Sequence, residues 1–262
     1  MSSLIRLKSA LKPAAVHLVC SSVVAIFAAA LVFGFWYPYP YRIMSGGREL
    51  FLLIIGVDIV CGPLLTLVVF NPAKKYKELW RDISFIALVQ LSALGYGTWT
   101  LWQARPLFLV SEVERFMVVA APDLRLSSDL DAVEALSRLP TALQPSLFSG
   151  PILVALRAPV NDAEATKVMI SYTMGGRDFA ERPEFYTAYD ARAALKTLVK
   201  AKPLAEFLLQ NASQQQEAQR LAAEKGVDIK QWQYLPVLAR QKWVAILSNQ
   251  GHLQGFLKAD GI

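Results

Sequence analysis

One acidic residue, Asp58, lies inside an apolar run of 21 residues, Leu50–Phe70. A carboxylate deep in a membrane span costs at least about 2.5–3.5 kcal/mol on insertion scales, so it normally faces protein and marks a functional position. Three roles fit: a protonated carboxyl group hydrogen-bonded within the helices, a contact that holds a partner helix, or part of a proton or ion pathway. One lone carboxylate suits transport poorly, which leaves the first two as the main alternatives.

The depth of each polar residue in its segment indicates which of them can meet Asp58. At a rise of about 1.5 Å per residue, Asp58 lies about 18 Å from the basic end of its segment, Tyr96 about 20 Å and His17 only about 5 Å from theirs. We therefore expect Asp58 to contact Tyr96, or Ser92 one turn below, and not His17. Pro63 is expected to kink the helix and free a backbone carbonyl.

A second group of candidates lies in Gly175–Tyr186, a segment dense in turn, charged and aromatic residues. Arginine and aromatic residues are frequent anchors of protein interfaces, so this segment is a candidate partner-contact loop. The alternative is a structured loop in which Asp178 caps a helix. The residues that would make the contact are Arg177, Asp178, Arg182 and Tyr186.

Catalytic patterns are missing from the sequence. It has no Gly-x-Ser-x-Gly, no His-Glu-x-x-His and no phosphate-binding loop, and no cysteine follows residue 104. His252 stands beside a turn, as a solvated loop residue would, and Cys20 and Cys61 match neither a metal site nor a disulfide framework. We expect a protein that is not an enzyme, with no catalytic residue, no metal, no cofactor and no evident small-molecule substrate.

Three apolar segments must position the first group of candidates: Ala14–Trp36, Leu50–Phe70 and Ile83–Trp102, of 23, 21 and 20 residues. A helix of about 20 apolar residues crosses a bilayer, and a span must be helical to satisfy its own backbone. The first segment also resembles a secretory signal with a cleavage site at Ala28–Ala30, but its apolar run continues to Trp36 at full spanning length. Three transmembrane helices in contact with membrane lipid are predicted.

Flanking charges set the orientation. Seven Lys and Arg residues precede the first span or lie between the second and third, against two between the first and second. By the positive-inside rule, residues 1–13 and 71–82 are cytoplasmic and residues 105–262 lie outside, in the periplasm of a bacterial inner membrane. Residues 1–104 carry +5 of the net charge of +6. The excess charge therefore marks topology, and no nucleic-acid partner is expected.

The predicted organisation is a basic N-terminus (1–13), a three-helix transmembrane region (14–104, with spans at about 14–36, 50–70 and 83–102) and a periplasmic α+β domain (105–262). In that domain, apolar runs and turn residues predict strands and helices. The strands are expected at Leu107–Val119, Ile152–Leu156, Trp243–Leu247 and Leu253–Leu257, the last two joined by a hairpin turn at Asn249–Gly251. The helices are expected at Asp129–Leu139, Asp162–Met174, Asp190–Lys202 and Pro203–Lys225, the last of which is polar and ends at Gly226.

The block around Asp58 is the most specific motif. Gly56–Leu67, followed by Pro72 and Lys74-Lys75, resembles the second helix of the type IV pilin accessory proteins, the TfpX/TfpZ group. The resemblance continues through further blocks, at Ala87–Gly97, Arg105-Pro106, Val113–Phe116, Arg182–Tyr186 and Ala201–Leu204. It is close over about residues 14–120 and patchy beyond.

This resemblance implies an inner-membrane, chaperone-like protein that helps a type IV major pilin accumulate or assemble, with that pilin as its partner. The membrane helices would contact the pilin helix and the tail its globular part. One alternative is a membrane-anchored sensor or regulator with a periplasmic domain, which the short cytoplasmic segments disfavour. Another is a pilin-modifying envelope enzyme, which would need convergent polar side chains in the tail.

Overall fold

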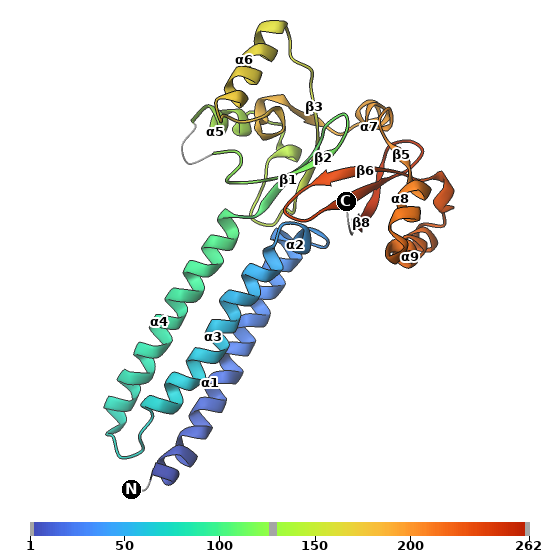
Figure 1. Ribbon diagram of the computed structural model, residues 1–262. Coiled ribbons are helices and arrows are strands. Elements are labelled where there is room, and N and C mark those ends of the chain that lie inside the picture. Colours follow the sequence, from blue (N-terminus) through green and yellow to red (C-terminus); the bar gives the residue numbers. More distant parts are fainter. Residues whose placement is uncertain (1–2, 126–129, 260–262) are drawn as a thin grey trace. The chain divides into compact units, whose positions relative to one another are not determined.

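Figure 1 shows the computed structural model, which describes residues 3–125 and 130–259. Residues 1–2, 126–129 and 260–262, parts of the predicted N-terminus and tail, lie outside the described residues. The chain divides into two units: a helical unit, Met1–Pro38 with Gly47–Gln103, and a mixed unit, Tyr39–Gly46 with Ala104–Ile262. Each unit is described separately below.

The helical unit consists of long helices: α1 (Ser3–Leu31), which continues into the π-helical turn η1 (Val32–Trp36), α3 (Gly47–Val69) and α4 (Tyr76–Gln103). Helix α3 packs against both α1 and α4 (Figure 1). Glycines allow this close approach, since a Cβ atom at Gly97 would lie 2.5 Å from Ile54 Cγ2. The helices run longer than the predicted spans because polar residues extend them at their ends.

Two helices of this unit are long and apolar enough to cross a membrane, among the described residues and judged by length and composition alone. They are Arg6–Trp36 and Gly47–Val69, each with a mean hydropathy of 2.5. The prediction of three such spans is therefore supported only in part. The segment Ile83–Trp102 does form a helix within α4, but Gln90 and the Tyr-Gly-Thr-Trp-Thr stretch at 96–100 lower its hydropathy.

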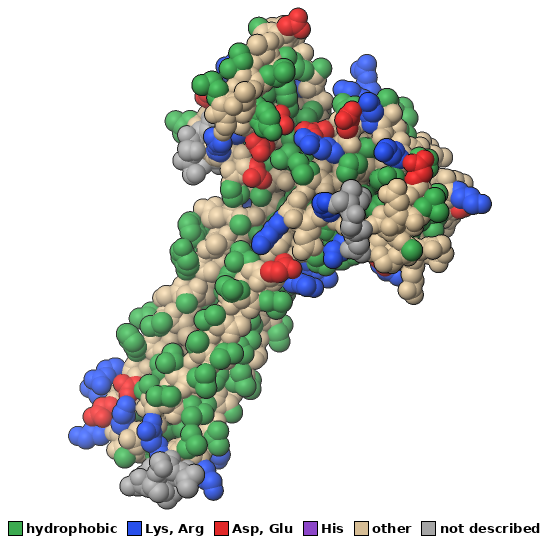
Figure 2. All heavy atoms as spheres, in the orientation of Figure 1, with side chains coloured by type: hydrophobic (Ala, Val, Ile, Leu, Met, Phe, Trp, Pro, Cys, Tyr) green, Lys and Arg blue, Asp and Glu red, His purple; other side chains and the backbone are tan. Residues whose placement is uncertain are grey.

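The outer surface of the helical unit is apolar, as Figure 2 shows for one face. Soluble domains rarely expose contiguous apolar patches larger than a few hundred square ångströms, so a surface of this kind indicates burial in lipid or against another protein. The exposed side chains come from each long helix and include Val19, Ile26, Phe27, Leu53, Val57, Leu64, Val68, Phe85, Leu88 and Leu91.

The mixed unit is built on one sheet, of eight strands in the described part of the chain. Its order is β4-β3-β1-β2-β6-β7-β8, and β5 pairs with β6. Neighbouring strands run antiparallel except β1 with β3 and β2 with β6, which are parallel. The strands are β1 (Pro106–Ser111), β2 (Phe116–Ala120), β3 (Ile152–Leu156), β4 (Tyr186–Ala188), β5 (Lys202–Pro203), β6 (Gln233–Leu238), β7 (Trp243–Leu247) and β8 (Leu253–Lys258).

Helices join these strands: α5 (Leu130–Ser137), α6 (Asp162–Thr173), α7 (Ala191–Leu198), α8 (Leu204–Gln210) and α9 (Gln215–Lys225). The short helix α2 (Tyr41–Met44), which precedes α3 in the chain, also belongs to this unit. Two predictions are wrong in detail. The strand expected at Leu107–Val119 is a hairpin, β1–β2, because Glu112 and Arg115 form a turn closed by a 2.9 Å backbone hydrogen bond. The helix expected at Pro203–Lys225 is interrupted at Asn211, between α8 and α9.

The core lies on both faces of the sheet. Every residue of β1 and of β7 is buried. From β7, Val244 and Ile246 pack with α8 and α9, whereas Trp243, Ala245 and Leu247 face a second cluster. Strands covered on both faces read as continuous apolar runs, which explains why the sequence indicated them clearly.

The segment Tyr39–Gly46, between α1 and α3, is part of this core. Met44 is completely buried in the same cluster as Trp243, and its carbonyl accepts a hydrogen bond from the backbone N–H of Gln241 at 3.1 Å. The Tyr41 ring packs edge-on against Phe256 with centroids 5.7 Å apart. The sequence prediction did not include this segment in the domain, because its contacts come from residues that follow α4.

Candidate partner-binding sites

Asp58 of α3 is half-buried and pairs with Gln90 of α4. The side-chain amide of Gln90 donates from Nε2 to the Asp58 carboxylate at 3.1 Å and to the Asp58 backbone carbonyl at 3.0 Å. Only 9% of Gln90 is exposed. The polar group expected inside the helices is therefore present, but its partner is an amide that the sequence prediction did not single out.

Gly62 makes room for this pair. A Cβ atom at position 62 would overlap the Gln90 amide, so the absence of a side chain there lets Gln90 reach α3. The other amide atom of Gln90, Oε1, is buried and has no hydrogen-bond partner in the described structure. A buried acceptor without a partner is costly, so this site has the capacity to accept one more hydrogen bond.

The predicted partners of Asp58 lie elsewhere. Tyr96 is 70% exposed and its ring lies 5.8 Å from that of Trp99, while Ser92 is also exposed. Both face outward from the helical unit, where an additional helix or lipid would meet them. His17 lies 2.6 Å from the Thr66 hydroxyl, which agrees with the expectation that it does not pair with Asp58. Pro63 is half-buried within α3, which continues to Val69.

The loop at Gly175–Tyr186 is held by internal contacts. Asp178 caps the short 3-10 helix η3 (Phe179–Glu181): its carboxylate accepts from the Phe179 N–H at 2.7 Å, and Glu181 accepts from the Asp178 N–H. Burial raises the pKa of the Glu181 carboxyl group. This capping box is the structured-loop alternative to a partner-contact role.

The remaining candidates of the loop are also engaged within the fold. Arg177 is buried and donates to the Glu181 carbonyl at 3.1 Å, and Arg182 donates to the Ser171 hydroxyl at 2.9 Å. The Tyr186 hydroxyl is buried and donates to the Ala180 carbonyl at 2.5 Å. These contacts favour a scaffolding role for the loop over direct partner contact.

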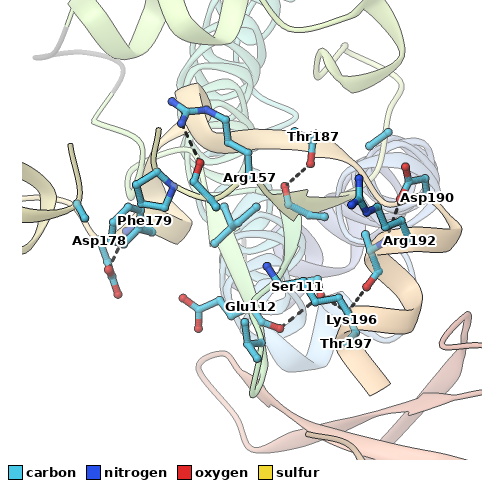
Figure 3. Close-up of a pocket in the computed structure, with 18 residues that line it drawn as sticks. Ser111, Glu112, Arg157, Asp178, Phe179, Thr187, Asp190, Arg192, Lys196 and Thr197 are labelled. Atoms are coloured by element: carbon cyan, nitrogen blue, oxygen red, sulfur yellow. Dashed lines mark hydrogen bonds between the residues drawn. The ribbon is translucent and has the colours of Figure 1, made fainter. Parts of the chain in front are cut away.

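The mixed unit also has a pocket of about 940 Å³, which could not be predicted from the sequence because its walls come from separate segments. It lies at the carboxyl ends of the parallel strands β1 and β3, beside β4, α7 and η3 (Figure 3). The lining residues include Ser111, Glu112, Val113, Ala155, Leu156, Arg157, Pro159, Asp178, Phe179, Thr187, Ala188, Asp190, Arg192, Ala193, Lys196 and Thr197.

Within residues 3–125 and 130–259, no three His, Cys, Asp or Glu side chains are grouped so that they could hold a metal ion. Cys20 and Cys61 are free and exposed.

Fold and sites together define a class of protein in which an apolar helical unit, with two helices of membrane-crossing length, carries a mixed α/β domain. The chain belongs to the family of fimbrial assembly proteins. Residues 5–46 match the family model described as "Fimbrial assembly protein FimB". The resemblance to type IV pilin accessory proteins found in the sequence is thereby confirmed.

Two relatives from Dichelobacter nodosus match nearly the whole chain, and a third matches less than half of it. The chain is 34% identical over 254 residues to "Fimbrial assembly protein, serogroup I", across 96% of this chain and 95% of the relative. It is 33% identical to "Fimbrial assembly protein, serogroup E1", again across 96% of this chain and 95% of the relative. The protein of serogroups C1 and C2 is 41% identical over 117 residues, which is 45% of this chain and 89% of that relative. No solved structure matches the chain.

Proposed function

We propose that the chain is an inner-membrane accessory factor that binds a type IV major pilin, stabilises it and so supports pilus assembly. The observation that carries the proposal is the similarity to fimbrial assembly proteins over 96% of the chain. The proposed action is binding and not catalysis, because the polar candidates of the loop at Gly175–Tyr186 are occupied by contacts within the fold.

Three membrane crossings form part of this proposal. Tyr39–Gly46 and the chain after Ala104 belong to one unit, so both must lie on the same side of a membrane. If α3 crosses the bilayer, the chain must cross back before residue 104, and α4 is the helix that connects them in the described structure. Ile83–Trp102 carries no charge, and the one strongly polar side chain in its centre, Gln90, is turned toward α3. These features support α4 as the third span.

Charge supports the direction of these crossings. The basic N-terminus and the loop after α3 carry most of the excess Lys and Arg. Arg6 of α1 donates to the Phe70 carbonyl at 3.3 Å, which places these two basic ends at the same end of the helical unit. By the positive-inside rule, that end is cytoplasmic and the mixed unit is periplasmic.

The helical unit is the proposed contact for the membrane helix of the pilin. Its outer surface is apolar, and the Asp58–Gln90 pair places a half-exposed carboxylate and an unpaired amide oxygen between α3 and α4. A partner helix that donates a hydrogen bond to the half-exposed Asp58 carboxylate would use its remaining acceptor capacity. Binding would stabilise the pilin by mass action, as RT ln(1 + [L]/Kd), where L is the accessory factor.

Deleting the chain's gene from cells that make the pilus tests the proposal. We expect the pilin protein and surface pili to decrease while the pilin transcript stays unchanged, because loss of a binding partner acts on the protein. Re-expression of the wild-type chain should restore both. A fall in the pilin transcript would contradict the proposal and favour a regulator.

Capture of the pilin from detergent-solubilised membranes tests the role of Asp58. Asp58→Ala should reduce the captured pilin at unchanged expression, and Asp58→Asn should retain much of it because its amide oxygen still accepts from Gln90. Cys61→Ala, an exposed position on the same helix, is the matched control and should behave as the wild type. Wild-type capture by Asp58→Ala would remove Asp58 from the binding site.

A further inference from the structure

We infer that the pocket between β3, β4 and α7 binds an acidic, extended segment of the pilin subunit; this inference rests on the proposed function. The pocket is large, about 940 Å³, near the upper end of the range usual for ligand sites. It lies in the mixed unit, far along the sequence from Asp58. The charged side chains of its lining differ in whether they have a charged partner within the fold.

The acidic side chains that line the pocket are engaged. Asp190 caps α7 by accepting from the Ala193 N–H at 2.8 Å, and Asp178 caps η3. Glu112 forms an ion pair with Arg115. Glu112 is therefore paired with a cation, and Asp178 and Asp190 are held in place by backbone N–H donors within the fold.

One of the three cationic side chains, Arg157, is engaged as well. It forms a two-pronged ion pair with Glu164, at 2.8 and 3.0 Å, and lies 4.3 Å from the centre of the Phe185 ring. The Arg157 guanidinium and the Val160 N–H lower the pKa of Glu164 to about 2. The positive charge of Arg157 is therefore neutralised by Glu164 within the fold.

Arg192 and Lys196 are the two cations that remain. They stand four residues apart on α7, both exposed, and in the described part of the chain neither forms an ion pair. Figure 3 shows them on one side of the pocket, with Asp178 and Phe179 on the opposite side. The lining cations that have no ion-pair partner therefore lie along one helix, where carboxylates of a ligand would pair with them.

The rest of the lining suits a peptide. The lining is apolar at Ala155 and Leu156, and a buried pair of hydroxyl groups, 2.8 Å apart, joins Ser111 of β1 to Thr197 of α7. Thr187 and Ala188 belong to β4, the last strand of the described sheet on that side. An edge strand is where an extended chain commonly adds to a sheet. A segment with acidic side chains on one face and apolar ones on the other fits these walls.

Site-specific photo-crosslinking of the full chain in piliated cells tests where the segment binds. A benzophenone amino acid is placed at Val113, which lines the pocket and is half-exposed, and as a control at Leu209, which is exposed on α8 outside it. We expect the pocket position alone to capture the pilin, and mass spectrometry to place the crosslink in a segment containing Asp or Glu.

Charge reversal then tests the recognition. The double variant Arg192→Glu/Lys196→Glu should lower capture about tenfold, the effect of losing two exposed ion pairs and gaining repulsion. Arg192→Gln/Lys196→Gln should give a smaller loss, and raising the salt concentration should weaken wild-type capture. Lys225→Glu/Lys230→Glu, an equal charge change outside the pocket, is the matched control. Changing the captured acidic residues to Lys should restore binding to the Glu variant.

The outcomes separate the inference from the proposed function. If the wild-type chain binds pilin but the pocket position captures none, or charge reversal has no effect, the pocket is not the binding site and the proposed function stands. If the captured segment carries no acidic residue, Arg192 and Lys196 do not recognise the ligand by charge and the inference is wrong. If the wild-type chain binds no pilin by any measurement, both are overturned.

Discussion

Replacing Met44 with alanine is expected to destabilise the mixed unit, although Met44 lies outside the chain segment 104–262 that makes up most of that unit. The side chain is 0% exposed and packs in the cluster that contains Trp243, Leu235 and Val237. Removing a buried methionine side chain leaves a cavity in addition to losing its transfer free energy.

The expected cost is about 2–5 kcal/mol, the range for Met→Ala in protein cores. The mixed unit falls in the size class in which 1 kcal/mol shifts the melting temperature by about 2–4 °C, which gives a decrease of about 4–20 °C. The lower part of this range would indicate that Trp243 and its neighbours collapse into the space.

Temperature-dependent proteolysis of the full chain in detergent, followed through fragments of the tail, measures this change. Met174→Ala is the matched control, since the same atoms are removed from a side chain that is 83% exposed. Its melting temperature should stay within about 1 °C of the wild type, as expected for surface substitutions. Equal behaviour of the two variants would refute the assignment of Tyr39–Gly46 to the core.

Three further outcomes are expected. Gly46→Ala should lower the melting temperature of the mixed unit by at least about 2 °C, because its φ of +76° is strained for alanine. Gly62→Ala should destabilise the helical unit in detergent, because the added Cβ atom would displace the side-chain amide of Gln90. Gly56→Ala should not, because no atom lies close to the added Cβ atom at that position. Glu164 has a folded pKa of about 2 against an ordinary 4.5, so its ion pair with Arg157 should stabilise fully above about pH 4.5 and be lost as the pH falls toward 2. The stability difference between wild type and Glu164→Gln should shrink across that interval in acid-unfolding measurements.

Local patterns predicted those elements whose formation depends on neighbouring residues. Ile152–Leu156 is β3 as expected, and the hairpin expected between the last two strands turns at Gly251, whose φ is +80°. Gly226, expected to stop a helix, takes the left-handed conformation directly after α9. Turns and helix ends at such glycines can be predicted from the sequence, because few other residues adopt a positive φ.

Features that depend on distant residues could not be read in the same way. The turn between β1 and β2 could not be predicted because most of Leu107–Val119 is apolar. The break at Asn211 could not be predicted because the residues from there to Gly226 form one polar run. For Asp58, depth alone allowed Tyr96, but which side of α4 faces α3 is set by packing, and that side carries Gln90. The walls of the pocket come together only when the sheet forms.

The inclusion of Tyr39–Gly46 in the mixed unit has a consequence for biosynthesis. This segment leaves the ribosome before α3 and α4, yet its partners in β6, β7 and β8 are made last. In the proposed topology, the unit cannot be completed until α3 and α4 have been inserted and the tail has reached the side of the membrane where Tyr39–Gly46 already lies. A molecule with α3 and α4 inserted in the wrong sense would leave Met44 exposed and the core unfilled. Under that topology, we expect completion of the fold to depend on correct insertion, so that a wrongly inserted molecule exposes an incomplete domain to proteolysis.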